Sequence, residues 1–136
     1  MRGQECLNKG VLSEKVQMEV ELDVFSGRPN PRLGLLPHQA REFTNILRRL
    51  PRQRKHAVPP EQGLGYRGFI VTGTSDELGN YDKVVVANGS VHARSGSVSL
   101  QLEDRDRALE RWLLENIRGQ VDDATYKYVL GEIDGS

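Results

Sequence analysis

Hydrophobic and polar residues alternate strictly between Val16 and Val24. An apolar side chain stands at every second position, and the intervening positions hold Gln17, Glu19, Glu21 and Asp23. Because successive side chains of a β-strand point to opposite faces, this pattern is typical of a strand with one buried and one solvated face. The sequence therefore predicts a first strand from Val16 that ends at Phe25.

Two later segments have the three- and four-residue spacing of an amphipathic helix. In the first, Pro37 suits the opening turn and Pro51 ends the pattern, so we expect a helix over residues 37–50. The second begins after Asp104, which can cap it, and ends at Gly119. Their expected buried stripes are Ala40, Phe43, Ile46, Leu47 and Leu50 in the first helix, and Leu109, Trp112, Leu113 and Ile117 in the second.

The middle of the chain has the composition and the turns of β-hairpins. Residues 66–72 and 83–87 are rich in β-branched and aromatic side chains. The dipeptide Asn88-Gly89 favours a type I′ turn, because both central residues of that turn need a positive φ. Ser95-Gly96 supplies a second turn before the alternating residues 98–102. We therefore predict an antiparallel meander in this region.

Together these elements predict an α+β fold of two layers. We expect an antiparallel or mixed sheet of four to five strands, in the order β-α-β-β-β-α, with two main helices on one face. A short C-terminal helix is expected over residues 124–130, ending at Gly131. Residues 1–15 have no period and are interpreted as a mobile N-terminal lead-in to a single domain over residues 16–136.

Composition narrows the possible functions. The chain carries 19 Lys and Arg against 19 Asp and Glu, so its net charge gives no general attraction to nucleic acid. Cys6 is the single cysteine, and His38, His56 and His92 share no ligand spacing with it, so we expect no metal and no other cofactor. No apolar run approaches the ~18 residues of a membrane span, and the first residues lack the apolar centre of a secretory signal. We therefore expect a cytoplasmic protein without a membrane partner.

The turn after the first strand, SGRPNPR, is the strongest candidate site. Its two prolines fix φ and remove backbone donors, so the turn is expected to be stiff. Guanidinium groups suit a carboxylate or a phosphate, and the hydroxyl, amide and glycine NH are further donors. The candidate ligand-binding residues here are Ser26, Gly27, Arg28, Asn30 and Arg32. The alternative is a loop held by its own hydrogen bonds, with Asn30 in a local turn and Arg28 paired with Asp23 or another carboxylate at the edge of the core.

A glycine-rich stretch, GLGYRGFIV at residues 63–71, matches the pattern G-x-G-x-x-G. The dinucleotide fingerprint must follow a strand and open a helix, whereas this stretch follows a proline-rich loop and opens a strand, so nucleotide binding is not favoured. We expect Gly65 and Gly68 to permit a close backbone approach, with Tyr66 and Arg67 on opposite faces. If Tyr66 and Arg67 nevertheless face the SGRPNPR turn, they complete the predicted ligand pocket.

The leading hypothesis is a small binding or accessory protein. It would recognise an anionic small molecule, or a carboxylate-bearing segment of a protein partner, through the SGRPNPR turn with Tyr66 and Arg67. Exposed, half-polar sheet edges would also allow a homodimer.

Two other hypotheses belong to different classes. A small enzyme could use the same pocket, with Glu21, Asp23 or His92 as the base and Arg28 as electrostatic stabiliser. A third possibility is weak binding to a nucleic-acid backbone through the basic residues 48–56, for which a solvated basic face is the simpler explanation.

Overall fold

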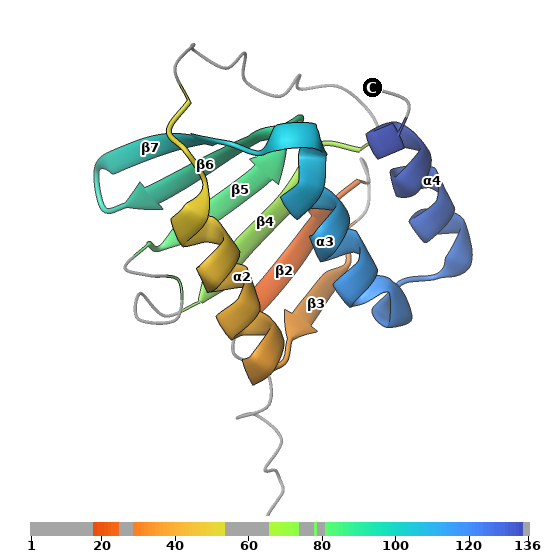
Figure 1. The fold of residues 1–136 in the computed structure, drawn as a ribbon. Helices are drawn as coiled ribbons and strands as arrows, with labels where there is room; N and C mark the ends of the chain where they lie inside the picture. Colours follow the sequence, from red (N-terminus) through yellow and green to blue (C-terminus); the bar gives the residue numbers. More distant parts are fainter. Residues whose placement is uncertain (1–17, 25–28, 54–65, 74–77, 79–80, 135–136) are drawn as a thin grey trace, which may run out of the picture.

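The computed structural model of this chain describes residues 18–24, 29–53, 66–73, 78 and 81–134. Its elements form a sheet with helices on one side (Figure 1). In chain order they are β2 (Met18–Asp23), β3 (Arg32–Leu35), α2 (Pro37–Arg49), β4 (Gly68–Gly73), β5 (Lys83–Ala87), β6 (Ser90–Ser95), β7 (Val98–Glu103), the 3-10 turn η2 (Arg105–Arg107), α3 (Ala108–Ile117), the 3-10 turn η3 (Arg118–Gln120) and α4 (Asp123–Asp134). No helix in these ranges is both long and apolar enough to cross a membrane. Residues 1–15, predicted to be a mobile lead-in, lie outside the described residues.

The predicted α+β class with an antiparallel sheet is confirmed, but the predicted strand count and order are wrong. Six described strands lie in the order β3-β2-β4-β5-β6-β7, and every neighbouring pair is antiparallel. The missed strand is β3, which pairs with β2 immediately after the SGRPNP turn. It is four residues long with two buried leucines, Leu33 and Leu35, which is too short for its alternation to stand out in the sequence.

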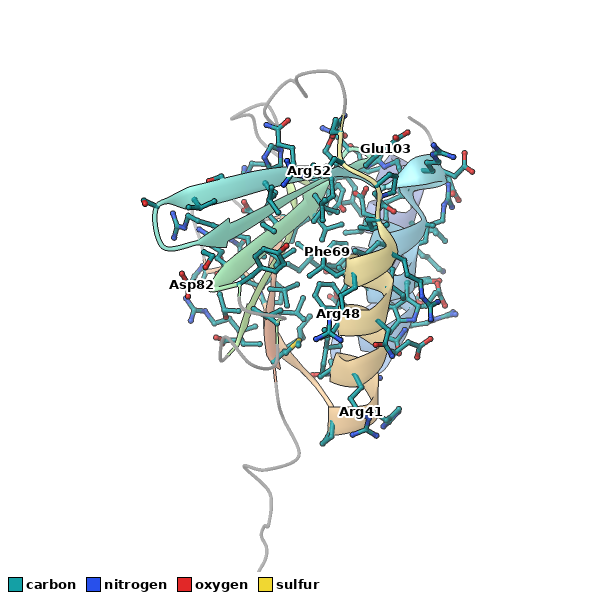
Figure 2. All side chains as sticks on the ribbon, turned by 60° about the vertical axis from the view of Figure 1, so that its left-hand side comes forward. Arg41, Arg48, Arg52, Phe69, Asp82 and Glu103 are labelled. Atoms are coloured by element: carbon teal, nitrogen blue, oxygen red, sulfur yellow. The ribbon has the colours of Figure 1, made fainter. Side chains whose placement is uncertain are left out.

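The core lies between the sheet and the helices. Phe43 of α2 and Trp112 of α3 pack with their ring centroids 6.1 Å apart, which joins the two helices above the sheet. Figure 2 shows Phe69 pointing from β4 toward α2. Helix α4 packs beside α3 and adds Tyr126, Val129 and Ile133 to the same apolar cluster. The described elements therefore share one core.

Several local predictions can be compared directly with the structure. Asn88 and Gly89 have φ of 53° and 76°, as a type I′ turn requires. Gly68 has φ of 115°, and a Cβ placed there would lie 2.6 Å from the Cβ of Ala87, so this glycine permits the expected close backbone approach. The predicted stop at Gly131 is wrong, since α4 continues to Asp134, and a glycine costs an α-helix only about 1 kcal/mol.

The other face of the sheet, which we call the open face, carries no helix of the described ranges (Figure 1). Its side chains alternate with the core residues along each strand, and the strand register places them in rows across the sheet. One row contains Glu21, Ile70, Val85 and His92, and the next contains Glu19, Thr72, Lys83 and Arg94. The open face is therefore acidic along β2, apolar near its centre and basic along β5 and β6.

Candidate functional site

Of the predicted site residues, Ser26, Gly27 and Arg28 lie outside the described residues. Asn30 is described, and its side chain faces the end of β2. Its amide oxygen accepts the backbone NH of Val24 at 3.1 Å, while its amide nitrogen donates to Glu21 at 3.0 Å and to Asp23 at 3.1 Å. Asn30 thus holds the strand end by local hydrogen bonds, as the structural alternative for this turn expects.

Arg67 hydrogen-bonds the Asp23 carboxylate, to which Asn30 also donates. Its Nε and Nη2 donate to Asp23 Oδ1 at 3.1 and 2.8 Å, and its backbone NH donates to the Asp23 carbonyl at 2.7 Å. The hydrogen bond to Asp23 raises the pKa of Arg67 further above its already high value. The structure therefore brings together two predicted site residues that are far apart in the sequence, and Asp23 positions both.

Arg32 lies beside this group, 3.7 Å from Glu19 and 3.8 Å from Glu21. The described part of the predicted site thus holds three carboxylates, those of Glu19, Glu21 and Asp23, against the two guanidinium groups of Arg32 and Arg67. Such a balance repels an anion rather than attracting it. Recognition of an anion at this turn stays a prediction, and the described residues do not favour it electrostatically.

Tyr66 lies apart from Arg67, as expected for neighbouring residues of an extended segment. Its hydroxyl donates to Glu110 of α3, on the helix side of the sheet, and its ring packs edge-on against Phe69 at 6.0 Å. Arg67 hydrogen-bonds Asp23 on the open side. Tyr66 therefore belongs to a different polar group from Asn30 and Arg67.

The Tyr66 hydroxyl is part of a buried polar cluster that sequence reasoning missed. The Glu110 side chain is 0% exposed, and Arg107 donates hydrogen bonds to both of its carboxylate oxygens at 2.8 Å, through Nε and Nη2. Burial raises the pKa of the Tyr66 hydroxyl. The i, i+3 spacing of Arg107 and Glu110 was visible in the sequence, but such pairs usually lie on solvated helix faces.

Backbone conformation completes this cluster. Asp106 and Arg107 have φ of 58° and 56°, a left-handed conformation that is uncommon outside glycine. Asp104 accepts the backbone NH groups of Leu109 at 2.8 Å and Glu110 at 3.1 Å, so its side chain satisfies the first turn of α3, although the N-cap residue of that helix is Arg107 and not Asp104. Burial raises the pKa of the Asp104 carboxyl. Because both Glu110 oxygens are engaged and enclosed, this cluster supports structure rather than chemistry on a ligand.

A third polar group lies on the open face, where β5, β6 and β7 form a shallow hollow of about 160 Å³. It is lined by Lys83, Val85, His92, Ala93, Arg94 and Ser99. Lys83 and Arg94 are direct cross-strand neighbours, and Arg94 is in turn opposite Ser99. The hollow is the most basic part of the open face.

The charges in this hollow are not compensated by the residues that the structure describes. No acidic side chain of the described ranges pairs with Lys83 or Arg94. Asp82, the nearest acid in sequence, instead accepts the backbone NH of Gly96 at 2.7 Å. Like charges directly opposite each other on a sheet are destabilising, so this pair is a cost to the fold.

His92 adds a second unsatisfied group. Its Nε2 is buried and has no hydrogen-bond partner within the described part of the chain. A buried nitrogen without a partner costs about 1–3 kcal/mol, so such atoms are rare in native structures. The described residues therefore leave two cations and one unsatisfied imidazole nitrogen in the same region of the open face.

The described residues hold no group of three or more His, Cys, Asp or Glu side chains that could bind a metal ion. Comparison of the chain with family models, with curated proteins and with solved structures gave no match.

Proposed function

We propose that this protein is a small binding protein that recognises an anionic group, a carboxylate or a phosphate, in the hollow formed by β5, β6 and β7. The observation that carries the proposal is the uncompensated set of Lys83, Arg94 and the buried Nε2 of His92. The class of function is the one expected from the sequence. The site is different, because the described surroundings of the SGRPNPR turn hold the three carboxylates of β2 against the two guanidinium groups of Arg32 and Arg67.

Each residue of the hollow has a distinct part in binding. The planar guanidinium of Arg94 can donate two parallel hydrogen bonds to a carboxylate or phosphate, and Lys83 adds a charge from the neighbouring strand. The unsatisfied Nε2 of His92 lies in the same lining and is a further candidate donor to the anion. The Ser99 hydroxyl lies across the strand pair from Arg94 and provides a further donor.

The affinity for a small free anion is expected to be low. The hollow is shallow and its cations remain in contact with water, so each charge is screened and contributes little by itself. We expect a dissociation constant of about 1 mM for phosphate at low salt, equivalent to about 4 kcal/mol of binding free energy. A larger ligand that carries such a group would gain affinity from further contacts.

Nuclear magnetic resonance titration of the labelled chain with phosphate and with acetate tests the proposal. We expect saturable shifts of the backbone amides of His92, Arg94 and Ser99, lost at high salt and lost in Arg94→Gln. Arg41→Gln is the matched control, because it removes the same charge from an exposed position on α2 (Figure 2). Titration to about 20 mM, some twenty times the expected dissociation constant, without shifts at these amides would overturn the proposal.

A further inference from the structure

We propose that the open face pairs with the open face of a second copy of this chain. This inference rests on the proposed function, because the anions that enter each hollow are then carboxylates of β2 from the other copy. The contact has two-fold symmetry, so each copy gives and receives the same groups.

The charge distribution of the open face is complementary to itself. Glu19 and Glu21 lie on β2, at one side of the sheet centre, and Lys83, His92 and Arg94 lie on β5 and β6, at the other. Between them, Ile70 of β4 and Val85 of β5 are cross-strand neighbours. Acid, apolar centre and base therefore follow one another across the sheet.

A two-fold axis parallel to the strands, midway between β4 and β5, matches these groups. It places β4 of one copy over β5 of the other, and β2 over β6, because the strand order is β3-β2-β4-β5-β6-β7. The row register then sets Ile70 opposite Val85 of the second copy. The same operation sets Glu19 opposite Arg94, and Glu21 opposite His92, of the second copy.

Glu19 is the β2 acid most available for this exchange, because Glu21 also accepts a hydrogen bond from Asn30 at 3.0 Å. The contact of Glu19 with Arg32, at 3.7 Å, joins two substantially exposed side chains, and such pairs contribute little stability. Asp23 is not counted, because it is engaged by Asn30 and Arg67.

The sheet edges are less suited to a dimer than the open face, contrary to the expectation from the sequence. At the β3 edge, the side chain of Gln120 accepts the backbone NH of Gly34 at 3.1 Å and donates to its carbonyl at 2.9 Å. At the β7 edge, residues 51–53 already pair with the strand, through Gln53 to Gln101 and Glu103 to Pro51. Covered edges resist the addition of another strand.

The size of the open face fits a weak dimer. With strands about 4.8 Å apart and a rise of about 3.3 Å per residue, six strands of about six residues cover roughly 29 by 20 Å, or about 600 Å² per copy. Two such faces bury about 1,200 Å², at the lower end of specific interfaces. We therefore expect a dimer that dissociates at micromolar concentration.

Sedimentation of the full chain over a range of concentrations tests this inference. We expect a reversible dimer that is weakened by salt and abolished by Val85→Glu. Val98→Glu is the matched control, because Val98 is 64% exposed at the start of β7, on the side of the sheet opposite to Val85, and should leave the dimer intact. A folded chain that stays monomeric at about 500 µM, or an equal loss in both variants, would overturn the inference.

Charge reversal gives a sharper test of the symmetry. Glu19→Lys and Arg94→Glu should each weaken the dimer roughly tenfold or more, because each creates two like-charge contacts across the axis. The double variant should regain most of the lost affinity, since Lys at position 19 then faces Glu at position 94 of the other copy. Absence of this rescue would exclude the proposed pairing even if the chain is dimeric.

The two proposals can fail separately. If the chain is monomeric but phosphate shifts the amides of His92 and Arg94, the second-copy inference is wrong and the anion site stands. If phosphate has no effect on either the amides or the dimer, the anion site is wrong. If phosphate dissociates the dimer and also shifts these amides, both proposals are supported.

Discussion

The buried pair of Arg107 and Glu110 allows a stringent prediction about stability. Arg107→Met removes the guanidinium while keeping an unbranched side chain of similar length, and leaves the Glu110 carboxylate with the Tyr66 hydroxyl as its remaining side-chain partner among the described residues. The carboxylate is 0% exposed and therefore cannot recover its lost partner from water. We expect Arg107→Met to destabilise the fold by about 3–5 kcal/mol, as is typical when one member of a buried ion pair is removed.

The magnitude follows from the geometry. Arg107 donates to both carboxylate oxygens at 2.8 Å, which places the two charges about 4 Å apart and gives an attraction of about 4 kcal/mol at an effective dielectric constant near 20. Glu110→Met should also destabilise, because it leaves the Tyr66 hydroxyl and the Arg107 guanidinium without their acceptor. The double variant Arg107→Met with Glu110→Met should be more stable than the two single losses together predict, by at least about 2 kcal/mol.

Equilibrium unfolding in urea, followed by the fluorescence of Trp112, measures these differences, since Trp112 is the single tryptophan and packs against Phe43. Arg111→Met is the matched control, because Arg111 lies one turn further along, on α3, and pairs with Asp134 at the surface, so it should cost less than about 1 kcal/mol. A loss below about 1 kcal/mol in Arg107→Met, or full additivity in the double variant, would refute this reasoning.

Three further predictions concern other parts of the fold. Gly68→Ala should lower the free energy of unfolding in urea by more than about 2 kcal/mol, because the new Cβ would lie 2.6 Å from the Cβ of Ala87. Gly131→Ala should instead stabilise α4 by up to about 1 kcal/mol, because a Cβ at that position has nothing within 4 Å. Burial raises the pKa of the Asp104 carboxyl above 3.8, so the folded state binds this proton more tightly than the unfolded state does. The free energy of unfolding of the native chain, relative to that of Asp104→Asn, should therefore fall as pH rises from 3.8 through the raised pKa. A difference between the two chains that does not depend on pH would contradict this. Asn30→Ala should speed hydrogen exchange of the Val24 amide, which loses its acceptor, and unchanged exchange would show that Asn30 does not hold the strand end.

Much of the fold was predictable because its signals are local. The alternation along β2 and the Asn88-Gly89 turn specify conformation within a few residues, and the helix over residues 37–50 was predicted to within one residue of its observed end at Arg49. β3 was missed for the same reason, since a strand of four residues carries too little pattern and is defined by its pairing with β2.

The candidate sites depended on contacts between distant segments. Arg67 reaches Asp23 across a separation of 44 residues, and Tyr66 reaches Glu110 across the same separation, in opposite directions from adjacent positions. The sequence alone determined that Tyr66 and Arg67 would point to different faces, because an extended backbone alternates its side chains. Which partner each would meet depended on the order of the strands and on the placement of α3.

Some features of the hollow on the open face were likewise set by the sequence, and others only by the tertiary structure. The amino-acid sequence determined that Lys83 and Arg94 lie on two strands joined by a tight turn, and that His92 alternates with the core residues Val91 and Ala93. Only the tertiary structure decided that both cations lie on the open face, which carries no described helix. It also decided that the acids of β2 lie on this same face, at the other side of the sheet centre. Local patterns set which face of a strand a side chain occupies, whereas burial and net charge at a site arise from elements that the chain brings together over long distances.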